Sequence, residues 1–324
     1  MRPLHAWTNH EFQIPLPAGH RFPSAKYAPL VERVLSEGLV ERDQLHPARE
    51  APVAWLERTH AAEYVARAIG GTPTMDDARR LGLPWSRALV ARARASVYGT
   101  VAASFAALTH GVSGNLAGGS HHAHRDRAGA YCLFNDIAVA IEVLRARGFA
   151  RRPFVVDLDV HQGDGTATCF AGDPSVFTFS MHAGANYPAR KAQSSLDVEL
   201  DSGCDDSTYL AALETHLPAA LEHHRPDLVW YQAGVDPLDE DRLGKLAITA
   251  DGLARRDSHV FEWCERVGAP VVVTLGGGYS DPHDASVEAH LGVWRAARHA
   301  RERRASVNDP RPFDHGVDEA LAAD

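Results

Sequence analysis

Short apolar segments alternate with longer amphipathic segments through most of the chain. The short segments are rich in β-branched and aromatic residues, whereas the longer ones repeat their apolar positions every three to four residues. Strands that alternate with helices imply right-handed crossovers and a parallel sheet covered by helices on both faces. The predicted strands are Phe154–Leu158, Val176–Met181, Leu228–Gln232 and Val271–Leu275, and the predicted helices are Trp85–Thr109, Asn135–Arg147, Tyr209–His224, Gly252–Val267 and Ser286–Arg303.

No repeat, low-complexity tract or long linker divides the sequence, and apolar segments continue to about residue 297. We therefore expect one α/β domain over residues 1–308 and a C-terminal tail over residues 309–324. The uncharged stretch between Arg94 and Arg125 contains many polar residues, so it is interpreted as a buried helix that runs into a loop. A membrane span would need about 20 mostly apolar residues.

Composition narrows the possible partners and the compartment. Lys and Arg number 33 against 42 Asp and Glu, which gives a net charge of −9 and argues against a nucleic-acid-binding protein. The basic run from Arg295 to Arg304 is accordingly interpreted as a solvated helix face. The four cysteines form no CxxC pair and the first residues show no secretory signal, so a cytoplasmic protein without membrane association is expected.

Polar residues and glycines follow the predicted strands. The carboxyl ends of parallel strands meet at one edge of a sheet, where open α/β sheets bind their ligands. Separate segments are therefore expected to bring their reactive groups to one rim. These groups are Asp157, Asp159, His161 and Asp164 after the first strand, His182 at the end of the second, Asp236 after the third and Gly276–Tyr279 after the fourth.

Three of these side chains suit a catalytic metal site. Asp159 and His161 lie two residues apart on extended chain and project to the same side, and Asp236 can supply a third ligand from another strand. One imidazole and two carboxylates suit Zn²⁺, Fe²⁺, Co²⁺ or Mn²⁺ and leave a position open for water and substrate. The alternative is that Asp159 and His161 cap a helix, but their place directly after an apolar strand favours the metal site.

The adjacent histidines His121 and His122 follow a flexible Gly118-Gly119 pair. Two neighbouring imidazoles can divide proton transfer and electrostatic stabilisation between them when different carboxylates orient them, and Asp157 and Asp164 are the candidates. The alternative is a pair of solvated loop histidines.

The segment from Gly276 to Tyr279 lacks the spacing of a phosphate-binding loop. Its glycines permit a close backbone approach that holds the Tyr279 phenol as a hydrogen-bond donor to a developing oxyanion. The alternative is a tight turn with an ordinary tyrosine.

Taken together and in this order, these segments resemble the histone deacetylase family from about Pro17 to about residue 297. The resemblance implies the family's arginase/deacetylase fold, a single-domain α/β architecture of three layers with a central, mostly parallel sheet. Weaker support comes from GHRFP at 19–23 and RTHAAEY at 58–64. The strings that carry the resemblance are GGSHHA at 118–123, DLDVHQGDGT at 157–166, FSMH at 179–182, AGVDPLDEDRLG at 233–244 and LGGGY at 275–279.

The resemblance also implies a role for each matching residue. His122 becomes the general base and later the acid, oriented by Asp164, while His121 with Asp157 becomes its electrostatic partner. Tyr279 becomes the oxyanion donor. The implied Zn²⁺ ligands, with Fe²⁺ possible, are Asp159, His161 and Asp236, and the implied structural K⁺ site is made of Asp157, Asp159, His161, Ser180 and the backbone of Met181.

The substrate tunnel departs from the family pattern. Many members have a Gly-Phe pair where this chain has Ala130-Tyr131, and the second aromatic is expected to be Tyr187. Leu243 occupies the position of the acidic gatekeeper of polyamine-selective relatives, which disfavours a polyamine substrate. A rim aspartate is expected at Asp76 or Asp77, and an acidic rim at 239–241. The expected tunnel residues are Ala130, Tyr131, His182, Tyr187, Leu243, Gly277 and Gly278.

The predicted activity is a zinc-dependent amidohydrolase that removes acetyl or longer acyl groups from lysine side chains or related small amines. Metal-activated water, His122 and Tyr279 would carry it. Two alternatives remain at this point: an arginase-like binuclear manganese hydrolase, which two equivalents of Mn²⁺ would favour, and a non-catalytic module that binds acyl groups.

Overall fold

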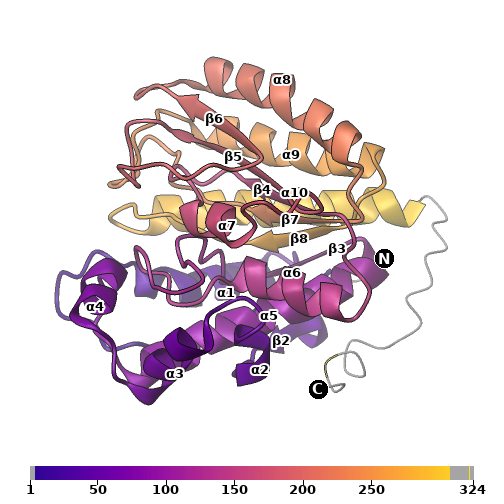
Figure 1. Cartoon of the computed structure of the whole chain (residues 1–324). Helices are drawn as coiled ribbons and strands as arrows, with labels where there is room; N and C mark the ends of the chain where they lie inside the picture. Colours follow the sequence, from indigo (N-terminus) through magenta and orange to yellow (C-terminus); the bar gives the residue numbers. More distant parts are fainter. Residues whose placement is uncertain (1–3, 307–320, 322–324) are drawn as a thin grey trace.

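Eight strands form one sheet in the computed structural model, which describes residues 4–306 and 321 (Figure 1). The strands are β1 (His5–Thr8), β2 (Leu45–Pro47), β3 (Val112–Asn115), β4 (Pro153–Asp157), β5 (Phe177–Ala183), β6 (Leu196–Leu200), β7 (Leu228–Gln232) and β8 (Val271–Thr274). Their order across the sheet is β2-β1-β3-β8-β7-β4-β5-β6, and every neighbouring pair is parallel. The predicted α/β architecture with a parallel sheet is confirmed.

The four predicted strands are all present, with ends shifted by at most two residues. The prediction of a helix running directly into a loop before Arg125 is wrong, because β3 follows the helix. This strand reads VSGN, which has only one β-branched apolar residue, yet all four of its residues are buried. The edge strand β6 and the polar strands β1 and β2 were also not predicted.

The helices that were predicted from the periodicity of apolar residues agree closely with the structure. The five predicted helices are confirmed as α5 (Arg87–His110), α6 (Asp136–Ala146), α8 (Asp206–His224), α9 (Ala250–Arg266) and α10 (Asp284–Ser306). The side chains of Ser86 and Asn135 cap α5 and α6 by accepting backbone N–H groups of the first turn. The remaining helices are α1 (Tyr27–Ser36), α2 (Val53–Leu56), α3 (Ala62–Gly70), α4 (Met75–Leu81) and α7 (Asp164–Cys169), with short 3-10 turns at Ser24–Lys26 and Arg42–Gln44.

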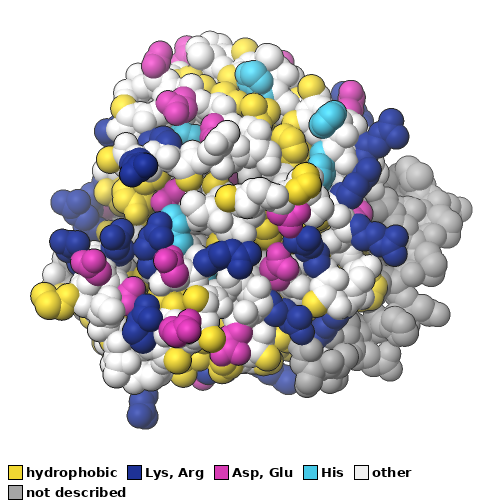
Figure 2. All heavy atoms as spheres, in the orientation of Figure 1, with side chains coloured by type: hydrophobic (Ala, Val, Ile, Leu, Met, Phe, Trp, Pro, Cys, Tyr) yellow, Lys and Arg dark blue, Asp and Glu magenta, His cyan; other side chains and the backbone are white. Residues whose placement is uncertain are grey.

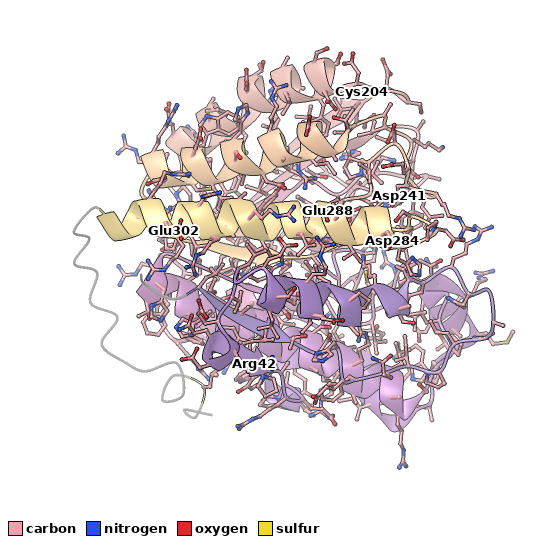
Figure 3. All side chains as sticks on the ribbon, turned by 180° about the vertical axis from the view of Figure 1, so that it is seen from behind. Arg42, Cys204, Asp241, Asp284, Glu288 and Glu302 are labelled. Carbon is pink, nitrogen blue, oxygen red and sulfur yellow. The ribbon has the colours of Figure 1, made fainter. Side chains whose placement is uncertain are left out.

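Two cores flank the sheet because successive side chains of a strand point to opposite faces. In β8, Val271 and Val273 join the core under α1, α8, α9 and α10, whereas Val272 joins the core under α2, α3, α5 and α6. Figure 1 shows the sheet between these two helical layers, and Figure 3 shows α10, which carries Glu288 and Glu302, crossing the back of the molecule.

The basic run on α10 is mostly paired. Arg295 contacts Glu37 and Glu288, and Arg303 contacts Glu265. Arg301 departs from the predicted solvated face because its side chain is buried. The predicted tail over residues 309–324 lies outside the described residues apart from 321.

The strands β3, β8, β7 and β4 are consecutive in the middle of the sheet. The segments that follow them carry the tandem histidines, the glycine-tyrosine turn, Asp236 and the Asp-His pair. The topology therefore brings the predicted site residues to one edge. Within residues 4–306, we find no helix with the length and apolar character needed to cross a bilayer.

Candidate active site

Asp159, His161 and Asp236 lie together at the carboxyl ends of β4 and β7. Each offers a ligand atom within 4.8 Å of the others, and all three are buried. His161 Nδ1 lies 3.0 Å from Asp159 Oδ1 and 3.1 Å from Asp236 Oδ2, so a single ring nitrogen faces both carboxylates. Two backbone groups fix the carboxylates: Gly277 N–H donates to Asp159 Oδ2 at 2.7 Å, and Val160 N–H donates to Asp236 Oδ1 at 2.8 Å.

The electrostatics of this group suit a cation. Burial and the nearby charge of Asp159 raise the pKa of Asp236 to about 7. Burial disfavours the charged imidazole of His161, but the hydrogen bonds with Asp159 and Asp236 outweigh it and raise the pKa of His161 to about 10. Two buried carboxylates that share one imidazole nitrogen need a positive charge beside them, and a divalent cation can supply it in place of the proton on His161. The donor set therefore fits Zn²⁺ or a related metal.

Each of the tandem histidines is held by a different carboxylate. His121 Nδ1 lies 2.7 Å from Asp157 Oδ2, and His122 Nδ1 lies 2.6 Å from Asp164 Oδ1. His124 Nε2 is also 3.2 Å from Asp164 Oδ2. The predicted pairs are thus brought together, and both histidines line the cavity, where His121 Nε2 lies 3.8 Å from Asp159 Oδ1.

The two imidazoles differ in their affinity for a proton. Burial lowers the pKa of both, but Asp157 and Asp159 outweigh it at His121 and raise that pKa to about 9. At His122, burial and the positive charge of His121 lower the pKa to about 4, although Asp164 acts in the opposite direction. At neutral pH the pair therefore consists of a cationic His121 beside a neutral His122, whose rings are 4.0 Å apart.

The loop before the tandem histidines is tied to the fold by Asp136, at the start of α6. Its carboxylate accepts the backbone N–H groups of Gly119 at 3.0 Å and Ser120 at 2.7 Å, and the hydroxyl of Thr100 at 2.6 Å. Gln232 Nε2 donates to the Gly119 carbonyl at 2.8 Å. These buried hydrogen bonds fix the position of the loop and therefore of the two imidazoles that follow it.

Tyr279 is held at its backbone. Its N–H donates to Asp241 Oδ2 at 2.5 Å, and the preceding carbonyl of Gly278 accepts from Lys26 Nζ at 3.1 Å. Burial, together with the charges of Asp159 and Asp236, raises the pKa of Tyr279 well above its ordinary value, so the phenol keeps its proton. At Gly277, a side chain would overlap the Asp236 carboxylate, which explains the glycine there.

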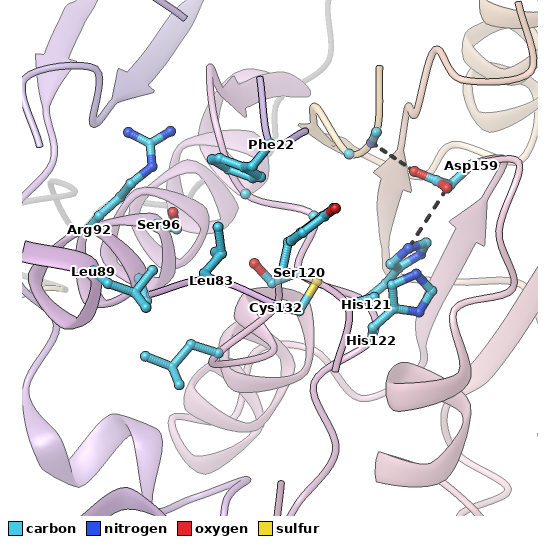
Figure 4. A pocket seen from close by; sticks show the side chains of 18 of the residues that line it. Phe22, Leu83, Leu89, Arg92, Ser96, Ser120, His121, His122, Cys132 and Asp159 are labelled. Carbon is cyan, nitrogen blue, oxygen red and sulfur yellow. Dashed lines mark hydrogen bonds and ion pairs between the residues drawn. The ribbon is translucent and has the colours of Figure 1, made fainter. Parts of the chain in front are cut away.

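A cavity joins these groups to the surface. Its mouth is lined by His122, Tyr131, His161, Tyr187, Leu243 and Tyr279, among others. The Tyr187 ring stands edge-on to His122 with centroids 4.7 Å apart, and the Tyr131 ring lies 6.1 Å from that of Tyr279. Figure 4 shows the inner part, which runs past His121, His122 and Asp159 towards Leu89, Arg92 and Ser96.

Comparisons with known proteins identify the family of this fold. The histone deacetylase domain matches residues 20–294, which is most of the chain. The chain belongs to the histone deacetylase family. Similar proteins include an uncharacterized protein of Picosynechococcus sp., 44% identical over 89% of this chain and 96% of the relative, and histone deacetylase 2 of Arabidopsis thaliana, 32% identical over 80% and 70%.

Solved structures show the same fold. An HDAC homolog complexed with SAHA aligns with a TM-score of 0.78 at 24% identity, over 98% of this chain and 92% of that one. An HDAC homolog from Aquifex aeolicus aligns with a TM-score of 0.77 at 23% identity over the same shares. The family makes this protein a deacetylase, a hydrolase of amide bonds with the arginase/deacetylase fold.

Several predicted rim and tunnel residues of this histone deacetylase lie elsewhere. His182 is fully buried within β5, where its Nδ1 contacts Ser180 Oγ at 2.9 Å, and it does not line the cavity. Asp77 is buried and caps α4 together with Thr74, while Asp76 pairs with Arg79. Neither aspartate lines the mouth.

The acidic rim is also smaller than predicted. Asp241 turns inward to accept the backbone N–H groups of Leu243, Gly244 and Tyr279. Asp239 and Glu240 are exposed but do not line the mouth.

Sequence reasoning missed the groups that position this deacetylase site. Lys26, Asp136 and Gln232 bind the loops that carry Tyr279 and the tandem histidines, and Asp241 binds the backbone of Tyr279. The roles of Asn135 and Asp136 could have been inferred from the sequence, because both are polar residues at the start of a predicted helix. No sequence pattern indicated the roles of Lys26 and Asp241, because they bind backbone carbonyl and amide groups far away in the chain.

Proposed function

We propose that this deacetylase is a zinc-dependent enzyme that removes acetyl or longer acyl groups from lysine side chains or related small amines. The observation that carries the proposal is the pairing of His121 with Asp157 and of His122 with Asp164, on the same cavity as the Asp-His-Asp group. This arrangement supplies one neutral and one cationic imidazole beside three buried metal-ligating groups.

Asp159, His161 and Asp236 would hold the Zn²⁺, or Fe²⁺ in its place. A bound divalent cation supplies Lewis acidity towards the acyl carbonyl and lowers the pKa of a water molecule near it. The Gly277 N–H and Val160 N–H bonds keep the two carboxylates oriented for this task.

His122 is the general base in this proposal. Its depressed pKa leaves the ring neutral and able to take a proton from the attacking water, and Asp164 fixes the ring orientation. The same ring returns the proton to the leaving amine. One water molecule is consumed, the C–N bond breaks, and a carboxylate and an amine are released. His121 stays cationic and stabilises the negative charge that develops.

Tyr279 donates its phenol hydrogen to the tetrahedral oxyanion. Its strongly raised pKa supports this role because a donor must remain protonated. Tyr131 and Tyr187 form the walls of the mouth through which the acyl chain enters, with Ala130, Gly277 and Leu243 close by.

A structural K⁺ is a further part of the proposal. Its ligands would be oxygens of Asp157, Asp159, His161, Ser180 and Met181. The strand register supports it, because Asp157 and Ser180 are direct partners in β4 and β5.

A reconstitution experiment tests the proposal. The purified protein is stripped with a chelator, reloaded with Zn²⁺, Fe²⁺ or Mn²⁺, and assayed with acetyl-lysine peptides, longer acyl-lysines, acetylpolyamines and small acetylated amines. We expect hydrolysis with one metal equivalent per chain, and a loss of about 10²–10⁴ in rate for His122→Ala. Full activity only with two equivalents of Mn²⁺ would favour a binuclear hydrolase, and metal binding without hydrolysis of any substrate would favour a binding module.

A further inference from the structure

A second hollow opens beside the mouth of the active site and is lined by basic side chains. Its cations are Arg80, Arg127, Arg190 and Lys191, which we call the basic groove. The hollow shares Arg80 and Tyr187 with the mouth, so the two lie side by side. A substrate that enters the mouth beside Tyr187 therefore passes close to the basic groove.

Most of this positive charge is not neutralised locally. Arg80 and Arg190 are exposed, and neither guanidinium group has an ion pair or a hydrogen bond within residues 4–306. Lys191 Nζ donates to the carbonyls of Asn186 and Pro188, each at 2.7 Å, and forms no ion pair among residues 4–306. Arg127 pairs with its neighbour Asp126 at 2.9 Å.

Negative charge in the hollow is scarce. Asp164 is the one carboxylate among its lining residues, and it already binds His122 and His124. Arg21 and Arg242 line another cavity with Leu243 and Tyr279, two residues that also line the mouth, although Arg242 pairs with Asp281. In Figure 2, several Lys and Arg side chains lie on the left beside acidic side chains, and others lie in the middle and on the right. The basic lining of the hollow contrasts with the net charge of −9.

We propose that the site selects acylated amines that carry an anionic group, a carboxylate or a phosphate, close to the acylated nitrogen. The inference rests on the proposed deacylase function and adds the charge of the substrate to it. Guanidinium groups bind carboxylates and phosphates through paired N–H donors, and a cationic rim raises the local concentration of anions. A lysine-rich or polyamine substrate meets repulsion at the same place.

The test uses three acetyl-lysine peptides of equal length, in which the residues flanking the acetyl-lysine are Glu, Ala or Lys. We expect the ratio of kcat/KM for the Glu peptide to that for the Lys peptide to be at least about tenfold at low salt and to shrink as salt is added. A fourth peptide with phosphoserine flanks shows which anion the groove prefers.

Charge-reversal variants test whether the basic groove causes the preference for the Glu peptide. Arg80→Glu and Arg190→Glu are expected to remove the preference for the Glu peptide, measured as the ratio of kcat/KM for the Glu peptide to that for the Lys peptide. Arg151→Glu is the matched control, because this exposed arginine precedes β4 and so lies at the opposite end of the sheet from the mouth. A preference that survives in both groove variants, or that disappears equally in the control, would overturn the proposal.

A binding measurement separates this inference from the proposed function. Fluorescence anisotropy with labelled Glu and Lys peptides reports selection without any turnover. Tighter binding of the Glu peptide without hydrolysis would count against the deacylase alone. Hydrolysis of all three peptides at equal rates, with equal binding, would count against the anionic substrate alone.

Discussion

Lys26 Nζ donates a hydrogen bond to the carbonyl oxygen of Gly278 at 3.1 Å, although 252 positions separate the two residues. The same ammonium group lies 3.2 Å from His290 Nε2 and 5.8 Å from the centre of the Tyr279 ring, and it is almost completely buried. A single buried cation from the segment before α1 thus holds the backbone immediately before the predicted oxyanion donor.

Replacing Lys26 by methionine should disturb both function and stability. The Gly278 carbonyl and His290 lose their donor, so we expect the free energy of unfolding to fall by about 2 kcal/mol. The loop can then misplace Tyr279, which should lower kcat about tenfold or more with little change in KM. Urea unfolding and steady-state kinetics measure the two effects. A Lys26→Met protein that is less stable but has the same kcat would show that Lys26 has a structural role only.

Removing the phenol oxygen of Tyr279 should affect turnover and leave the fold intact. For Tyr279→Phe we expect kcat to fall about 10²–10³, because an oxyanion donor acts mainly in the transition state. The matched control is Tyr131→Phe, which removes a phenol from a ring 6.1 Å from that of Tyr279 and should change kcat little. Equal losses in the two variants would refute the assigned role of Tyr279.

The rate should depend on pH through the tandem histidines. His122 must be neutral to accept a proton, so activity is lost as the pH falls through its pKa of about 4. His121 must be cationic, so activity is lost as the pH rises through its pKa of about 9. Asp157→Asn removes the carboxylate that raises the pKa of His121, and the alkaline limb of kcat/KM should move to lower pH. An alkaline limb that stays in place would contradict this assignment.

Acid should destabilise the fold through His60. This buried ring accepts the Asn135 N–H at Nε2 and donates from Nδ1 to the His124 carbonyl, so it has no room for a second proton. Burial lowers its pKa from 6.5 to about 4, and the unfolded chain therefore binds more protons between these values. Stability contributed by neutral His60 is present above pH 6.5 and falls by about 3 kcal/mol towards pH 4. Unfolding titrations of His60→Gln should show a shallower pH dependence, and an unchanged slope would exclude His60 as a source.

The central strands and the site they carry could be predicted because both leave local signals. Val271–Leu275 and Leu228–Gln232 are apolar and rich in β-branched or aromatic residues; the first ends directly before Gly276, and the second ends four residues before Asp236. The pairing of Asp159 with His161 follows from the two-residue period of extended chain, and the structure places the two together.

Other features depend on contacts between residues that are far apart in the chain, and no local sequence pattern predicts such contacts. β3 pairs with β1 and β8 despite its weak strand pattern, and at Gly114 a side chain would come within about 3 Å of Val273 and Trp294. His182 comes directly after the predicted strand, but β5 continues to Ala183, so this residue is part of the strand and its ring is buried. The basic groove gathers residues from three distant segments, so the sequence alone pointed instead to an acidic rim.

The turn that carries Tyr131 has a wider consequence. Gly129 and Cys132 close it with two backbone hydrogen bonds, and its central residues Ala130 and Tyr131 have φ values of 20° and 67°, in a region that side chains other than glycine seldom adopt. Glycine at position 131 would relax the backbone but delete one wall of the entrance, whereas any larger replacement retains the strain. Tyr131 thus supplies both an aromatic wall of the entrance and a strained backbone conformation in the turn. Substitutions at this residue that widen the entrance will therefore also change the stability of the loop.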